Sequence, residues 1–238
     1  METKSVSELL KNNTYPGRGI ILGRSADNTC AVMAYFIMGR SVNSRNRIFT
    51  QTPDGIKTEA FDSSKMTDPS LIIYHPVRRL ETENGTVNIV TNGDHTDTIY
   101  EYMVSGKDVF SALHSRCFEP DGPHYTPRIS GVMYPGGDYV LSILKTMNGS
   151  PDCCVRNFFS YDRPVAGRGH LIHTYREDGN PLPSFVGEPV QIAIEGDIDA
   201  FPELLWNSLN ADNKVSLYVR YVNLENGTAE ERIINANK

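Results

Sequence analysis

The sequence of 238 residues contains no apolar run approaching the roughly 18 residues that a membrane-spanning helix requires. Its first segment reads METKSVSELLKNN, in which charged residues surround two leucines, unlike the apolar region of a signal peptide. A formal net charge of −6 leaves no excess of positive charge for non-specific binding to nucleic acid or anionic membranes. These absences predict a cytoplasmic protein without nucleic-acid or membrane partners. A small anionic ligand stays compatible with them, because local arginines decide such binding.

Cysteine is scarce, and its spacing fits no zinc motif. The four cysteines are Cys30, Cys117, Cys153 and Cys154, and we expect them to be reduced, mostly within the core, with no structural metal site. No Gly-x-Gly-x-x-Gly follows a strand, so a dinucleotide-binding motif is missing. The chain also has no Gly-x-Ser-x-Gly elbow and no Cys–His motif of known spacing, so nothing supports a covalent nucleophile.

Segments with the composition of strands outnumber those of helices, which favours an α+β fold with large, mostly antiparallel sheets. No repeat, low-complexity tract or Gly/Ser linker divides the sequence, so we predict one domain over residues 1–238. Helices are expected near residues 5–12, 98–104, 108–117 and 201–209. Strands are expected near residues 19–23, 31–38, 47–52, 55–61, 71–77, 87–90, 128–133, 139–147, 154–161, 169–175, 190–195, 215–223 and 232–235.

One stretch, from Ile89 to Arg128, has a high density of polar residues around a predicted strand-to-helix turn. Asn92-Gly93 supplies the turn, and Thr96 or Asp97 can cap a helix that begins a few residues later. Such a helix terminus exposes backbone N–H groups to an anion or another polar ligand. An ordinary, well-capped strand-to-helix turn explains the same residues equally well.

Arginines and carboxylates supply the other candidate functional groups. Glu119 follows an apolar pair at a helix end, where burial would raise its pKa and suit a general acid or base; it could also be an ordinary loop residue. Tyr74 could donate through its hydroxyl group. Further acid–base candidates are Asp94, His95, Asp97 and Asp121. The arginines cluster as Arg18 with Arg24, as Arg78-Arg79, and as a loop holding Arg40, Arg45 and Arg47 beside Ser41, Asn43 and Ser44, which could cradle a phosphate or form a solvated hairpin turn.

Together these motifs resemble those of the archaeal-type inosine monophosphate (IMP) cyclohydrolases. The most specific parts are the Asn-Gly-x-His-Thr-Asp-Thr string that ends at Thr98 and the Thr-Pro-Arg-Ile string that ends at Ile129. The resemblance covers about residues 15–134. The matching elements, in order, are Tyr15-Pro-Gly-Arg18-Gly, Gly23-Arg24, Arg40-Ser41, Asn43-Ser44-Arg45 with Arg47, Tyr74 in IIYHP, Thr91 to Thr98, Glu119, and Thr126-Pro127-Arg128-Ile129.

The resemblance implies a four-layer αββα sandwich like that of the N-terminal-nucleophile hydrolases. It also implies that this fold is used without an N-terminal nucleophile, in agreement with the ordinary start Met-Glu-Thr. The implied reaction closes the ring of 5-formamidoimidazole-4-carboxamide ribonucleotide, with loss of water, to give IMP in purine biosynthesis. It implies a homo-oligomer that needs no cofactor and no metal.

That reaction requires a group that orients or deprotonates the carboxamide nitrogen, a stabiliser of the developing oxyanion, and a proton for the departing hydroxyl. By resemblance, the reacting centre maps to Tyr74, Glu119 and Arg45, with Arg47 as the alternative arginine. Two other functions remain open: an amidohydrolase acting on a related ribonucleotide, and a non-catalytic purine-ribonucleotide sensor. The residues assigned to substrate binding are Arg18, Arg40, Ser41, Arg47, Asn92, Gly93, Asp94, His95, Thr96, Asp97 and Arg128.

Overall fold

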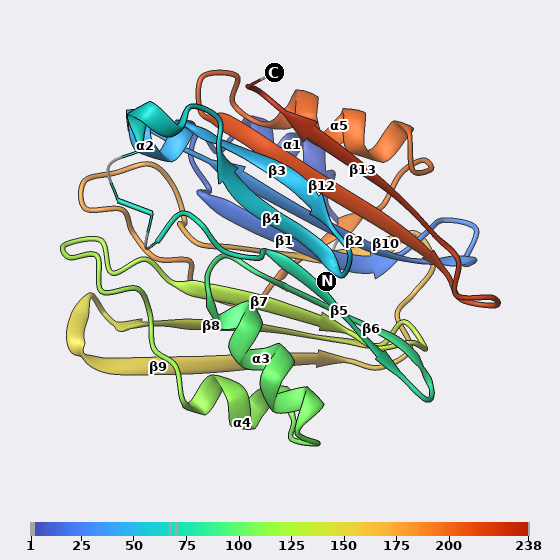
Figure 1. The fold of residues 1–238 in the computed structure, drawn as a ribbon. Coiled ribbons are helices and arrows are strands. Elements are labelled where there is room, and N and C mark those ends of the chain that lie inside the picture. The colour runs from blue at the N-terminus through green and yellow to red at the C-terminus, as the bar shows by residue number, and fades with distance from the viewer. Residues whose placement is uncertain (1–2, 67, 70, 238) are drawn as a thin grey trace.

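Two antiparallel β-sheets pack face to face in the computed structural model, which describes residues 3–66, 68–69 and 71–237 (Figure 1). Few helices accompany the sheets, and most of them lie on the outer faces. The α+β class and the antiparallel sheets predicted from the sequence are therefore confirmed. The first two residues, on which the expected absence of an N-terminal nucleophile depends, lie outside the described residues.

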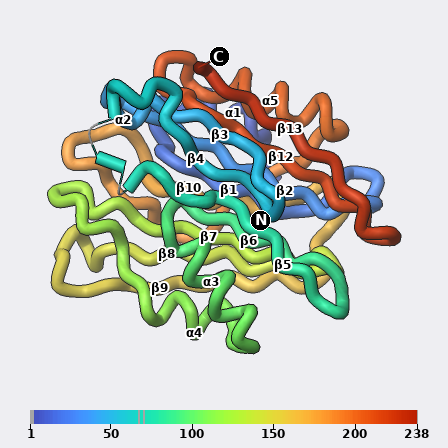
Figure 2. The backbone as a smooth tube through the Cα atoms, viewed as in Figure 1, coloured from blue at the N-terminus to red at the C-terminus, as the bar shows by residue number. Residues whose placement is uncertain are grey.

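One sheet has six strands in the order β11-β10-β1-β2-β12-β13. The two ends of the chain, blue and red in Figure 2, both contribute strands to this sheet. Its central strands read as near-continuous apolar runs because both of their faces are buried. The strands are β1 (Arg18–Arg24), β2 (Cys30–Met38), β10 (Arg168–His173), β11 (Val190–Ala193), β12 (Lys214–Asn223) and β13 (Ala229–Asn235).

The other sheet has seven strands in the order β3-β4-β5-β6-β7-β8-β9, so each strand pairs with its neighbour in sequence. The step from β6 to β7 is the longest, because α3 (His95–Val104), α4 (Val109–His114) and a loop intervene. The strands are β3 (Arg47–Thr52), β4 (Gly55–Ala60), β5 (Val77–Thr82), β6 (Gly85–Thr91), β7 (Arg128–Met133), β8 (Tyr139–Met147) and β9 (Ser150–Tyr161).

The main core lies between the sheets, where Ile20 and Tyr35 of one sheet share a cluster with Val90 and Ile129 of the other. A second cluster joins the outer face of the six-stranded sheet to α1 (Val6–Lys11) and α5 (Ala200–Ser208). A third joins the seven-stranded sheet to α3 and α4. The short helices α2 (Val42–Arg45) and η1 (Ser63–Lys65) lie outside these clusters. Among the described residues, no helix is long and apolar enough to cross a membrane.

Several local predictions are wrong. The segment from residue 71 to residue 76 is irregular and not a strand; its backbone bonds to Thr58 of β4, with Pro76 placed just before β5 begins. Helix α3 begins at His95, so Thr96 lies inside the first turn, and neither it nor Asp97 caps the helix. The cysteines are free as expected, but none is buried and Cys117 is exposed. The prediction that Asp108 starts the next helix is confirmed, because its carboxylate accepts from the Ser111 N–H.

Candidate active site

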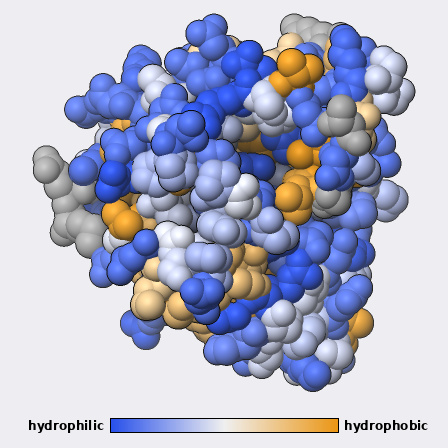
Figure 3. Space-filling view, turned by 90° about the vertical axis from the view of Figure 1, so that its left-hand side faces the viewer, coloured by the Kyte–Doolittle hydropathy of each residue, from blue (hydrophilic) through white to orange (hydrophobic). Residues whose placement is uncertain are grey.

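Three arginines stand at the first positions of β1, β3 and β7, at one end of the two packed sheets, to the left in Figure 1. These residues are Arg18, Arg47 and Arg128, and all three are buried. Figure 3 views this end of the molecule and shows it hollowed, with hydrophobic patches bordering the hollow. The antiparallel order of the strands therefore brings together cations that are far apart in sequence.

Arg47 is completely buried. Its Nε donates to the Ser44 carbonyl oxygen at 2.9 Å. Its Nη1 and Nη2 are buried and have no hydrogen-bond partner among the residues that the structure describes. Burial lowers the pKa of this guanidinium, because a low-dielectric surrounding disfavours the charge. Two unpaired charged donors cost considerable free energy in the free protein, so the geometry suits an anionic or strongly polar ligand.

Glu119 lies within the influence of all three arginines and is 2% exposed. Burial raises the pKa of its carboxyl group to about 7, although Arg18 and Arg128 act in the opposite direction. Glu119 is thus buried, and burial acts on its pKa in the direction expected from the sequence. A carboxyl group that titrates near neutral pH can both accept and return a proton during a reaction. Gly93 allows the close packing here, since a Cβ at this position would lie 2.5 Å from Arg128 Nη1 and 3.6 Å from Glu119 Oε1.

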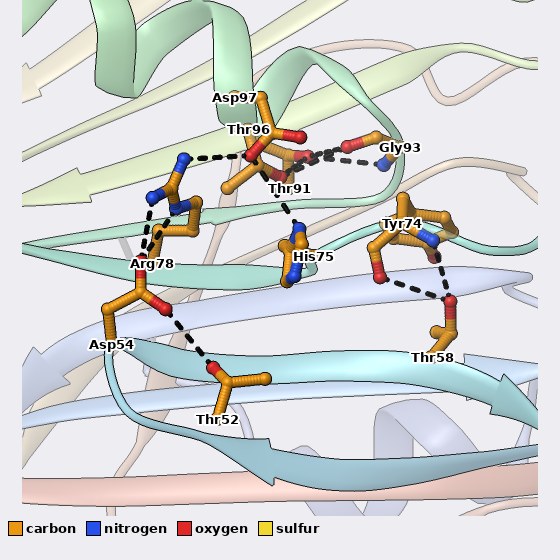
Figure 4. Close-up of polar contacts among 10 residues, drawn as sticks. All are labelled: Thr52, Asp54, Thr58, Tyr74, His75, Arg78, Thr91, Gly93, Thr96 and Asp97. Carbon is orange, nitrogen blue, oxygen red and sulfur yellow. Dashed lines mark hydrogen bonds and ion pairs between the residues drawn. The ribbon is translucent and has the colours of Figure 1, made fainter.

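Tyr74 carries its hydroxyl group to 2.9 Å from that of Tyr35, inside the core. The backbone of Tyr74 is fixed by Thr58, whose Oγ1 accepts from the Tyr74 N–H at 2.9 Å (Figure 4). Burial raises the pKa of Tyr35 well above its ordinary value, so this phenol stays protonated and can donate to Tyr74. Both tyrosines lie close enough to Arg47 to influence its charge. The hydroxyl groups of Tyr35 and Tyr74 therefore lie near the unpaired guanidinium group of Arg47.

The polar turn between β6 and α3 is held by its own side chains. Thr91 Oγ1 accepts from the Gly93 N–H at 3.1 Å and lies 2.6 Å from Thr96 Oγ1 (Figure 4). Asn92 connects the turn to β7, since its Nδ2 donates to the Pro127 carbonyl oxygen and its Oδ1 accepts from the Ile129 N–H. These buried hydrogen bonds fix the path of the chain past the arginines.

His95 and Asp94 hold Arg128 in place. Arg128 Nη1 lies 3.1 Å from His95 Nδ1 and 2.7 Å from Asp94 Oδ1. Because a guanidinium only donates, His95 Nδ1 is the acceptor, so Nε2 carries the proton and donates to the Ile129 carbonyl oxygen at 3.1 Å. Burial and the positive charge of Arg128 lower the pKa of His95 well below its ordinary value. His95 is therefore a neutral support for Arg128.

Four residues assigned to the site from the sequence have side chains engaged elsewhere. Arg45 is exposed, with its guanidinium bonded to the Gly39 carbonyl oxygen at 2.9 Å and to Asn213 at 3.2 Å. Arg40 pairs with Asp178 at 2.5 Å. The others are Ser41, which caps α2 through Ser44, and Asp97, which pairs with Arg78 (Figure 4).

Three tyrosines at this end of the sheets were not selected as site residues from the sequence. Tyr15 stacks on Tyr175 with ring centroids 5.9 Å apart, and the Tyr175 hydroxyl lies 2.6 Å from Thr126 Oγ1. Tyr175 and Glu119 both influence the charge of Arg18. Tyr15 opens the first matching motif and could have been selected on that basis. Tyr35 lies within the apolar run of β2, where no local pattern distinguishes it from a core residue.

The groups that converge here are arginines, tyrosines and one carboxyl group that titrates near neutral pH. No group of three or more His, Cys, Asp and Glu residues that could hold a metal ion occurs in the described part of the chain. The arrangement fits an acid–base site for a polar, anionic organic molecule between two antiparallel sheets.

A family model described as IMP cyclohydrolase-like protein matches residues 15–227, and the chain belongs to this family. The match confirms the resemblance found in the sequence motifs and extends it well past residue 134. No curated protein matches the chain significantly.

Replacing Asn92 with alanine should destabilise the protein by about 2–4 kcal/mol, because the Pro127 carbonyl oxygen and the Ile129 N–H would both lose their buried partner. Urea unfolding followed by circular dichroism measures this change. Asn84→Ala, at an exposed hairpin turn, is the matched control and should change the free energy of unfolding by less than about 0.5 kcal/mol. Equal effects of the two variants would contradict a supporting role for Asn92.

Proposed function

We propose that this protein is an IMP cyclohydrolase, which closes the ring of 5-formamidoimidazole-4-carboxamide ribonucleotide to IMP and releases water. The observation that supports this most is the buried Glu119 carboxyl, with a pKa of about 7, among three buried arginines and the Tyr74 hydroxyl. The net positive charge of this group suits a ribonucleotide phosphate, and Glu119 suits a reaction that moves protons at neutral pH.

In the proposed reaction the carboxamide nitrogen attacks the formyl carbon, forming the new C–N bond while the formyl oxygen gains negative charge. Glu119 accepts one carboxamide N–H proton and returns it to the oxyanion, which becomes a hydroxyl group. In the second stage Glu119 accepts the proton of the former formamide N–H and gives it to that hydroxyl; the C–O bond breaks, water leaves and the C=N bond of IMP forms. Arg47 and Tyr74 stabilise the developing oxyanion, because their donors are fixed by Ser44, Thr58 and Tyr35 before the substrate arrives. We therefore assign the role first given to Arg45 to Arg47.

Substrate binding in this proposal falls to Arg18 and Arg128, which would contact the phosphate or the carboxamide. The polar turn contributes mainly by fixing the path of the chain beside the arginines, since the side chains of Asn92, His95 and Thr96 already bond within the protein. Arg40, Ser41 and Asp97, which also have protein partners, would contribute at most at the rim of the hollow.

The order of helices, two sheets and helices also supports the proposal, because it has the layer sequence of the αββα sandwich that the family resemblance implies. A single domain, a cytoplasmic location and a homo-oligomer stay predictions.

Turnover can be tested by following ultraviolet absorbance after mixing the purified protein with the formamido ribonucleotide, without added metal or cofactor. We expect many turnovers per protein molecule and the spectrum of IMP as the product. No conversion, with IMP still bound at micromolar concentration, would instead indicate a ribonucleotide sensor. Neither conversion nor binding would overturn the assignment of the substrate.

A further inference from the structure

A cavity of about 580 Å³ lies on the outer face of the six-stranded sheet, beside α1. Leu9 of α1, Leu171 and His173 of β10, and Phe185 and Val190 line it. Arg18 and Glu119 are absent from its lining residues. Its volume is within the range of about 300–1,000 Å³ that is typical of small-molecule sites. It is therefore a second space, separate from the proposed active site.

His173 gives this cavity a defined polar group. Its Nδ1 lies 2.8 Å from the Tyr175 carbonyl oxygen, which can only accept, so Nδ1 carries the proton. Burial lowers the pKa of His173 to about 4, so the ring is neutral at pH 7. Its Nε2 is then a bare acceptor, with no hydrogen-bond partner among the residues that the structure describes. His173 is partly exposed, so water can donate to this acceptor, and an N–H or O–H group of a ligand can replace that water.

The other walls determine which kind of ligand fits. Phe185 stands nearly perpendicular to the imidazole, with ring centroids 4.7 Å apart. Leu9, Leu171 and Val190 add aliphatic surface. A neutral acceptor with an aromatic ring and aliphatic side chains beside it favours a flat, uncharged heterocycle that has one N–H donor. The charged lining residues are all exposed and carry both signs, so they do not select an anion or a cation; they are Lys4, Glu8 and Arg176, the last already paired with Glu177.

The cavity is connected to the proposed active site through two short chain segments. His173 bonds to the backbone of Tyr175, and Asn13, another lining residue, donates to the Arg176 carbonyl oxygen at 2.9 Å. The Oδ1 of Asn13 also accepts from the Tyr15 N–H at 3.1 Å. A molecule in the cavity would therefore contact the supports of the Tyr15–Tyr175 stack, which borders Arg18 and Glu119.

We propose that this cavity is an effector site for a neutral, nucleobase-sized heterocycle that donates a ring N–H to His173 Nε2. Its occupancy shifts the Tyr15–Tyr175 stack and so changes the affinity of the active site for its nucleotide. This second part rests on the proposed function; binding in the cavity does not. The effect must be reciprocal, so that nucleotide binding changes the affinity for the heterocycle by the same factor.

Benzimidazole and 1-methylbenzimidazole form a matched pair of probes, because the methyl group removes the ring N–H and keeps the flat shape. Nitrogen-15 NMR of labelled histidines should show a saturable shift of His173 Nε2 with benzimidazole. The methylated probe should bind about tenfold more weakly, as expected for loss of one buried hydrogen bond. No saturable shift with benzimidazole, or equal affinity for the two probes, would overturn the proposed site.

Two variants complete the test. His173→Phe keeps an aromatic ring but removes the acceptor, and Leu9→Trp fills the cavity; both should abolish the difference between the two probes. Val104→Trp, which adds bulk at an exposed position of α3, is the control and should keep it. Calorimetry of IMP binding, with and without benzimidazole, should show a change of at least about fivefold. Probe binding without such a change would overturn the effector role, and failure of catalysis alone would affect neither measurement.

Discussion

Glu119→Gln should lower kcat by about 10²–10⁴-fold while nucleotide affinity changes by less than about threefold. Glutamine has nearly the same shape as protonated glutamic acid but cannot accept or return a proton. Glu83→Gln, in an exposed hairpin, is the matched control and should retain full activity. Steady-state kinetics with IMP calorimetry separate the two effects, and a parallel loss of kcat and affinity would assign Glu119 to binding alone.

The same variant should reveal the raised pKa of Glu119. In unfolded chains this carboxyl titrates near 4.5, and in the folded protein near 7. Between these values the folded state holds a proton that the unfolded state has lost, so the stability of the natural protein falls as the pH rises. By pH 8 the loss is on the order of 3 kcal/mol. The Glu119→Gln protein has no titrating carboxyl group at this position, so it does not lose this stability. The difference in unfolding free energy between the variant and the natural protein, measured in urea, should therefore shift in favour of the variant from pH 4.5 to pH 8.

Much of the fold follows from local patterns in the sequence. The strands Arg128–Met133 and Tyr139–Met147 were predicted with their observed bounds, because strongly apolar segments flank a turn that contains Pro135, Gly136 and Gly137. The start of α3 was misplaced because Thr96 looks like a capping residue. Its hydroxyl instead bonds within the turn, to Thr91 and Gly93, a contact that depends on how β6 ends. A hydrogen bond of this kind depends on the tertiary structure and cannot be predicted from one segment of the sequence.

The candidate site was likewise predictable from the sequence only where local motifs mark a residue. The three buried arginines of the site could be selected from the sequence, because arginine in short polar motifs suggests anion binding. Burial is what separates Arg47 from Arg45, and burial depends on where β3 begins and on the packing of β3 against the opposite sheet. Tyr35 could not be found, since its hydroxyl gains its meaning only from Tyr74, which lies 39 residues away in the chain.

Arg47→Met and Arg45→Met decide which arginine serves the reaction. Methionine keeps much of the aliphatic length of arginine and removes the charged fork. Arg47→Met should lower kcat/KM by about 10²–10³-fold, because the two unpaired donors that would face the developing oxyanion are lost. Arg45→Met removes a guanidinium that bonds to Gly39 and Asn213 near the surface, and activity should change by less than about threefold. The reverse result would return the catalytic role to Arg45.

A stability measurement on Arg47→Met separates a loss of function from a loss of folding. Arg47 Nη1 and Nη2 have no hydrogen-bond partner within the described residues, so removing them takes away a desolvated charge and breaks only the bond from Nε to Ser44. The free protein should therefore be at least as stable in Arg47→Met as in the natural sequence. Arg47→Lys retains a charge without the planar fork, so it should recover binding of the anionic substrate more than kcat. An Arg47→Met protein that is both inactive and much less stable would instead mark the guanidinium as part of the core.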